Sequence, residues 1–311
     1  MILDFHTHLG DILPVYTGLK LTECSPAPHY LMISSGAMAD PERVFYRKRL
    51  SPFSFGFLRH AVITLLRRKR TWRGMTLPNL LNDMHTSQIT KSVVLPIEYQ
   101  DGIARSRQLL EECQDVPEVI PFCSVHPNDP EKIQKLHTYM QMGARGLKLH
   151  PNFQHIRPDD PANFELYEEY AGYRLPLMVH SGLTGREGYF RAARTFSAVD
   201  LIAAVPKNFP NMPVVLAHAG IAQYEQAIAL AQKYRNVYLE LSGQPAQHIR
   251  QALSAIGADR LLFGTDWPFW HQAFALQAVR QATQSDPPAE QCILHENAER
   301  LLRLERGEPV V

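Results

Sequence analysis

The sequence of 311 residues contains few cysteines and no long hydrophobic run. Its four cysteines, at positions 24, 113, 123 and 292, form no Cys-x-x-Cys pair, which argues against a disulfide framework or a zinc knuckle. No stretch approaches the roughly 18 uninterrupted apolar residues that a membrane span needs. The first residues include acid and histidine where a signal peptide would be basic and then apolar. We therefore expect a cytoplasmic protein with reduced thiols and no membrane span.

The chain also has little net charge, +1 with histidines neutral. The charge is unevenly spread, because ten basic residues and no acidic one lie between Arg43 and Asn82. No internal repeat, low-complexity tract or flexible linker divides the sequence. We expect one domain over residues 1–311, which acts on a small molecule, with an anion as one candidate, and not on nucleic acid.

Eight short apolar runs, most of them followed by helix-length segments, recur along the chain. They are residues 1–6, 92–97, 119–125, 145–150, 176–180, 213–218, 236–241 and 260–265. Several lack alternation of apolar and polar residues, as is typical of parallel strands buried on both faces. From the second run onward the spacing is roughly 30 residues, and no glycine-rich phosphate turn follows the first run. We predict an α/β fold, a (β/α)8 TIM barrel.

The segment 9–75, between the first and second runs, is longer than an ordinary loop and predicts a lid or binding insertion. Residues 53–70 place apolar side chains on one helical face and basic side chains elsewhere, so we expect the insertion to be mostly helical. Three roles remain open for it. It could be a lid over the barrel mouth, a homodimer contact or anion-attracting entrance, or a surface that docks on a membrane.

Metal-binding residue types end several of these runs. The first run leads into His6 and His8, which lie two residues apart and so share one face of an extended strand. Catalytic groups of TIM barrels lie at the carboxyl ends of the strands, where the other runs place His150, His180, His218 and Asp266. Imidazoles and a carboxylate at one rim predict a metal site.

These residues lie in motifs that resemble the amidohydrolase superfamily. The motifs are DFHTH, GARGLKLHP, LPLMVHSG, VVLAHAG, LLFGTDWPF and ENAERLL. Within the superfamily, the sequence is most similar to the amidohydrolase-related branch, which includes aminocarboxymuconate-semialdehyde decarboxylase, resorcylate-type decarboxylases and lactone hydrolases. The resemblance implies one divalent metal, most often Zn²⁺ with Mn²⁺ tolerated, held by four side chains, His6, His8, His180 and Asp266.

The resemblance also implies catalytic roles. His218 would lie near the metal and polarise or protonate the substrate, while Asp266 would accept a proton from a metal-activated water. Lys148 lies two residues before His150, and we expect one of the two to contact an anionic substrate group. In two-metal members of the superfamily a carboxylated lysine of the fourth strand bridges the metals, and an ion pair with a buried carboxylate is a further alternative. Trp267 and Phe269 would line the substrate pocket or pack in the core.

Two reactions fit this ligand set. We expect a metal-dependent hydrolase, in which activated water attacks an ester, lactone or amide. The alternative is a non-oxidative decarboxylase of an aromatic or unsaturated carboxylic acid. A barrel reused only for binding would have degenerate ligand positions, whereas every one of them is intact here.

Overall fold

The computed structural model describes residues 1–12, 18–25, 73–183 and 195–304. Within these ranges nine strands form two sheets, in the orders β1-β2-β3 and β4-β5-β6-β7-β8-β9, and every pairing is parallel. The strands are β1 (Leu3–Thr7), β2 (Lys91–Val94), β3 (Val119–Pro121), β4 (Cys123–Ser124), β5 (Leu147–Leu149), β6 (Leu177–His180), β7 (Val214–Ala217), β8 (Val237–Glu240) and β9 (Leu261–Leu262). Each lies within or overlaps one of the eight predicted runs.

The third predicted run is divided between the two sheets at Phe122. The N–H of Phe122 donates to the carbonyl of Val94 on the β2 side (3.0 Å), and the N–H of Cys123 donates to the carbonyl of Gly146 on the β5 side (2.9 Å). The backbone thus changes its hydrogen-bonding neighbour from β2 to β5 between Phe122 and Cys123. The two short strands β3 and β4 together occupy one strand position of the barrel.

The ring closes between β1 and the segment that follows β9. The N–H of Phe5 donates to the carbonyl of Phe263 (2.8 Å), and Thr7 forms a parallel bridge with Trp267. The predicted TIM barrel is therefore confirmed, with the first and last strands side by side.

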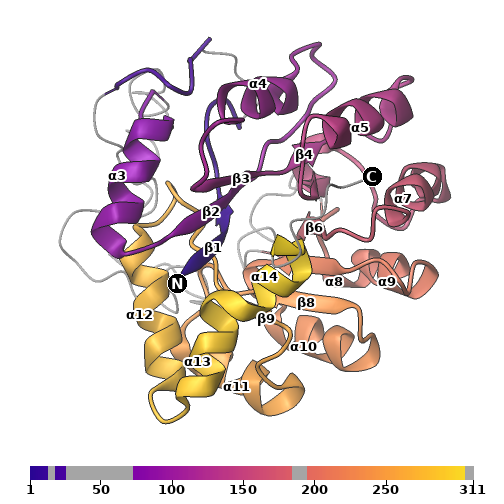
Figure 1. Cartoon of the computed structure of the whole chain (residues 1–311). Helices are drawn as coiled ribbons and strands as arrows, with labels where there is room; N and C mark the ends of the chain where they lie inside the picture. Colours follow the sequence, from indigo (N-terminus) through magenta and orange to yellow (C-terminus); the bar gives the residue numbers. More distant parts are fainter. Residues whose placement is uncertain (13–17, 26–72, 184–194, 305–311) are drawn as a thin grey trace, which may run out of the picture.

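Helices surround the strands (Figure 1). They are α3 (Leu77–Ser87), α4 (Arg105–Glu112), α5 (Lys132–Gln141), α6 (Pro151–Gln154), α7 (Phe164–Ala171), α8 (Val199–Ile202), α9 (Ala204–Asn208), α10 (Tyr224–Lys233), α11 (Ala246–Ile256), α12 (Gln272–Thr283), α13 (Pro287–Gln291) and α14 (Asn297–Leu302). In α10 the buried residues Ala227, Leu230 and Ala231 recur at helical spacing, so one face of the helix covers the sheet.

The interior of the barrel changes character along the strands. Its amino end is filled by an apolar cluster from the strands and α14: Leu3, Phe5, Val93, Leu95, Ile120, Phe122, Met178, Val215, Ala217, Leu262, Ala298, Leu301 and Leu302. Alternation places His180 on the same face of β6 as Met178, one step nearer the carboxyl end. In β1 a register shift between Asp4 and Thr7 lets both Phe5 and His6 face the interior.

Most of the predicted insertion 9–75, including residues 53–70, lies outside the described residues, so its helical structure and its role stay predictions. The described parts of the insertion are tied to each other and to α4. The N–H of Gly10 donates to the carbonyl of Met75 (2.8 Å), and the N–H of Leu21 donates to the Glu112 carboxylate of α4 (2.7 Å). Among the helices of the described ranges, none has the length and apolar character needed to cross a membrane.

Candidate active site

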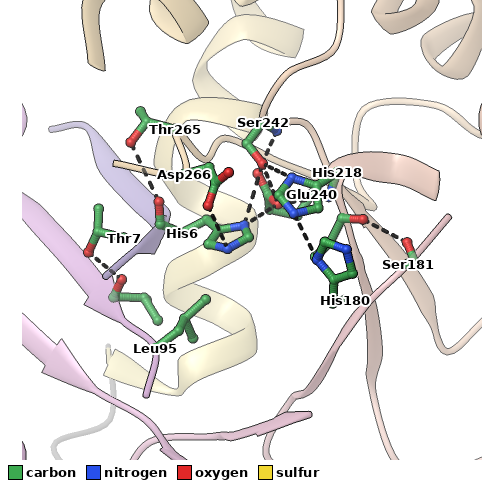
Figure 2. Close-up of polar contacts among 12 residues, drawn as sticks. His6, Thr7, Leu95, His180, Ser181, His218, Glu240, Ser242, Thr265 and Asp266 are labelled. Atoms are coloured by element: carbon green, nitrogen blue, oxygen red, sulfur yellow. Dashed lines mark hydrogen bonds and ion pairs between the residues drawn. The ribbon is translucent and has the colours of Figure 1, made fainter. Parts of the chain in front are cut away.

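His6, His8 and Asp266 meet at the carboxyl end of β1. The Nε2 atoms of the two histidines lie 3.1 Å apart, and Oδ1 of Asp266 lies 3.4 Å from Nε2 of His6 and 3.3 Å from Nε2 of His8. Figure 2 shows Asp266 beside the His6 ring. Three potential ligand atoms, from the ends of the first and last strands of the barrel, therefore lie close together.

The hydrogen bonds of these rings determine which nitrogens carry lone pairs. Nδ1–H of His8 donates to the carbonyl of Leu95 (2.7 Å), and Nδ1–H of His6 donates to the carboxylate of Glu240 (2.7 Å). A neutral ring has one N–H, so in that form each Nε2 atom carries a lone pair. Two lone pairs and a carboxylate oxygen repel one another at these distances unless a cation lies among them. The donor set fits a divalent metal with nitrogen and oxygen ligands.

Glu240, at the end of β8, orients this group and was missed in the sequence. It is fully buried, and besides His6 its carboxylate accepts the backbone N–H of His218 (3.0 Å) and both the N–H (2.5 Å) and the hydroxyl (2.9 Å) of Ser242. His6, His218 and Glu240 also have ligand-like spacing. We assign the metal to His6, His8 and Asp266, because the Glu240 oxygens already accept four hydrogen bonds. The signal for Glu240 is an acid inside the apolar run NVYLEL.

Asp4 supports the turn that carries Asp266. Its buried carboxylate accepts hydrogen bonds from the N–H (3.0 Å) and hydroxyl (2.6 Å) of Thr265 and from the side-chain amide of Gln272 on α12 (2.9 Å). Burial raises the pKa of Asp4 to about 7, and the hydrogen bonds from Thr265 oppose that rise. Asp266 itself has a left-handed backbone (φ 58°), a conformation that this network helps to hold.

His218 and His180 form a second histidine pair beside the first. The Ser242 hydroxyl donates to Glu240, so it accepts from Nδ1–H of His218 (2.8 Å), which leaves Nε2 of His218 unprotonated. That nitrogen lies 3.1 Å from Nδ1 of His180 (Figure 2). Burial lowers the pKa of both histidines well below the usual value. Of the four predicted metal ligands, His6, His8 and Asp266 lie together, whereas His180 contacts His218.

Lys148 and His150 face the same pocket from β5 and the residue that follows it. Lys148 is 1% exposed, and its Nζ has no hydrogen-bond partner among the residues that the structure describes. Burial lowers the pKa of Lys148 to about 8, although Asp266 and Glu240 oppose the shift. The His150 ring stacks against His180 and against Phe153, with 3.9 Å between ring centroids in each case. Nδ1 of His150 accepts the N–H of Phe153 (3.3 Å), which leaves Nε2–H as a donor.

These side chains line a pocket of about 280 Å³. Its polar lining comes from His8, Lys148, His150, His180, His218 and Asp266, together with Asn152, Ser242 and Gln244. Its apolar walls come from Ile12, Ile97, Phe153, Ile221, Phe269 and Trp270. Phe269 lines the pocket as the sequence led us to expect.

Trp267 differs from its expected place in the pocket wall. Its side chain is fully buried, and its indole N–H donates to Asp83 of α3 (2.8 Å). The expectation that it walls the substrate pocket is corrected, because Trp270, three residues later, provides the tryptophan of the lining.

Comparisons with known proteins agree with this geometry. A family model described as Amidohydrolase matches residues 76–304. An uncharacterised TIM-barrel protein of Bordetella bronchiseptica has a TM-score of 0.66 and 19% identity, and the match covers 97% of this chain and 98% of that one. For 5-carboxyvanillate decarboxylase of Sphingomonas paucimobilis the TM-score is 0.63, with 14% identity and coverage of 97% and 98%. No curated protein sequence matches the chain.

A third solved structure is a dihydroxybenzoic acid decarboxylase of Polaromonas sp. JS666 with bound manganese and the inhibitor 2-nitroresorcinol. Its TM-score is 0.63 at 19% identity, and the match covers 76% of this chain and 90% of that one. At these identities the likeness establishes the fold alone. The resemblance to the amidohydrolase-related branch is confirmed.

The expectation of ester, lactone or amide hydrolysis is wrong, because the solved relatives with a named activity, such as these two, are decarboxylases. Both reactions use the same metal ligands, so the motifs could not choose between them. The alternative that the sequence left open is the better supported one.

Proposed function

The chain belongs to the amidohydrolase family, and from that membership and its pocket we propose that it is a divalent-metal-dependent decarboxylase of a small aromatic carboxylic acid. The observation that carries the proposal is the convergence of His6, His8 and Asp266, whose lone pairs and charge need a cation between them. A bound Zn²⁺ or Mn²⁺ would supply Lewis-acid stabilisation of substrate oxygens. The nitrogen and oxygen donors suit either ion, and the relative from Polaromonas binds manganese.

The pocket suits a flat acid. Its walls are aliphatic and aromatic, and its polar groups gather where the barrel strands end. An aromatic ring would contact the apolar walls while its carboxylate reached the polar end. The solved relatives act on aromatic acids of this kind, and their names support the same substrate class for this chain.

Loss of CO₂ requires a proton at the carbon that held the carboxylate. The carbon–carbon bond breaks, its electron pair forms the new carbon–hydrogen bond, and the proton must come from a nearby acid. We assign this transfer to Nε2 of His218, because Ser242 and Glu240 fix the ring through Nδ1. Burial lowers the pKa of the ring, and the negative charge of a bound acid would raise that pKa and favour the protonated form.

Carboxyl-labelled aromatic acids test the proposal. Metal-loaded protein would be incubated with ¹³C-carboxyl benzoates that carry hydroxyl or methoxy groups, and labelled CO₂ would be measured in the headspace. We expect release from at least one acid, and none after the metal is removed by a chelator. Release that is unchanged without metal, or the absence of release across the panel while neutral esters are hydrolysed, would contradict the proposal.

The homodimer and the cytoplasmic location stay predictions. We propose that Lys148 and His150 contact the substrate.

A further inference from the structure

Among the described residues that line the pocket, Lys148 is the one with a buried side-chain polar atom that has no hydrogen-bond partner. Its side chain is 1% exposed, it lines the cavity, and its Nζ has no hydrogen-bond partner among described residues. Burying an ammonium group without a partner is costly, so such groups are normally paired. Nδ1 of the neighbouring His150 already accepts the N–H of Phe153, so that nitrogen is not free to accept from Lys148.

The charges around Lys148 indicate what its partner would be. Asp266 and Glu240 are the carboxylates that act on it. Before an acid binds, burial favours the neutral forms of the pocket histidines His150, His180 and His218, because it lowers the pKa of each. Asp4 is directed away, toward Thr265 and α12, and does not line the pocket. A divalent cation at His6, His8 and Asp266 would be neutralised by the two carboxylates. Lys148 therefore leaves this end of the pocket with one positive charge in excess.

We propose that Lys148 is the anion receptor of the pocket and makes it selective for monoanionic carboxylates over neutral analogues and over dianions. This inference rests on the proposed function, since it identifies the charge class of the same substrate. Nζ donates to a carboxylate oxygen of the ligand, and Nε2–H of His150 lies on the same side as a second donor. A second carboxylate would lie against the apolar walls with no described cation to pair with it.

Equilibrium binding tests this selectivity without turnover. Calorimetry on metal-loaded wild-type protein would compare benzoate, its neutral isostere benzamide and the dianion isophthalate. We expect benzoate to bind at least about 10-fold more tightly than benzamide, the size of effect that a charged hydrogen bond gives. We expect isophthalate to bind no more tightly than benzoate. Equal affinity for benzoate and benzamide, or much tighter binding of isophthalate, would overturn the proposal.

Variants identify Lys148 as the source of the selectivity. Lys148→Met should weaken benzoate binding by about 10-fold or more and change benzamide binding by less than about 2-fold. The matched control is Lys91→Met, at the amino end of β2, where Nζ donates to the carbonyl of Pro117 (2.7 Å). Metal content of both variants would be checked first. If Lys148→Met does not fold, Lys148→Gln removes the charge and keeps a polar end. Benzoate affinity equal to wild type in a folded Lys148 variant rejects the assignment.

The outcome can be separated from that of the proposed reaction. Selective binding of benzoate that depends on Lys148, without CO₂ release from any acid, would reject the decarboxylase and leave the anion receptor in place. Release of CO₂ with no dependence of benzoate binding on Lys148 would do the reverse.

Discussion

The two ends of the barrel interior are built from the same strands but differ in chemistry. The amino end is apolar, and Ile120, Met178 and Val215 pack there against α14. The carboxyl end holds buried charge, including Glu240 and Lys148. Met178 and His180 lie only two positions apart on β6. The comparison indicates that the apolar end stabilises the fold. The polar end lowers the stability of the fold, because it buries polar and charged groups away from water.

The largest expected effect is at the polar end. His218→Asn removes the proposed proton donor, so turnover should fall by about 10²- to 10⁴-fold while bound metal stays near the wild-type level. Steady-state assays and elemental analysis of the same sample would measure both. His137→Asn, on α5 beside Tyr173, is the control and should change neither quantity. Parallel loss of metal and turnover in His218→Asn would make His218 a ligand.

The apolar end should show the opposite pattern. Ile120 lies on β3, which carries no candidate site residue, and is 5% exposed. Ile120→Ala should lower the free energy of unfolding by about 2–5 kcal/mol through the cavity it leaves, and Ile120→Val by about 0.5–1.5 kcal/mol. Denaturant titration measures this. Turnover of the folded variants should remain that of wild type, and a large loss of turnover would show that the two ends are not independent.

The sequence predicted this division only in part. Strand positions and the histidines at their ends could be read from local patterns, since buried parallel strands are apolar and TIM barrels gather polar groups at one rim. The role of Glu240 depends on His6 of β1 and on His218, the residue that follows β7. The burial of Trp267 depends on Asp83, which lies 184 positions away. Contacts of that kind arise from packing between elements and leave no local signal.

Lys148 should show directly how much a buried charge at the polar end lowers the free energy of unfolding. Its pKa falls from 10.5 to about 8 on folding, so below pH 8 the charged side chain destabilises the native state by up to about 3 kcal/mol. Lys148→Met should therefore raise the free energy of unfolding of metal-stripped protein at pH 7. Between pH 8 and 10.5 the native state releases its proton before the unfolded state does, so wild-type stability should rise toward that of the variant. Denaturant titrations at pH 7 and 9.5 would measure the difference. A variant less stable than wild type at pH 7 would contradict the account.

A smaller effect is expected from the glycine beside Glu240. A Cβ at Gly264 would lie 2.2 Å from Oε1 of Glu240, so Gly264→Ala should displace the carboxylate that orients His6 and His218. Loss of such a supporting contact typically weakens metal affinity by about 10- to 100-fold. The control is Gly172→Ala, where the nearest atom to the new Cβ is 3.4 Å away. Competition with a chelator would measure both affinities, and an unchanged Gly264→Ala would argue against the role of Glu240.

The central claim is that the polar end of the barrel is organised around one divalent cation held by His6, His8 and Asp266. The direct measurement is the metal bound per chain, by elemental analysis, after chelator-stripped protein is dialysed against Zn²⁺ or Mn²⁺ and then against metal-free buffer. The account predicts one equivalent in wild type and a large loss of bound metal in His6→Ala. No retained metal in folded wild type, or full retention by His6→Ala, would contradict it.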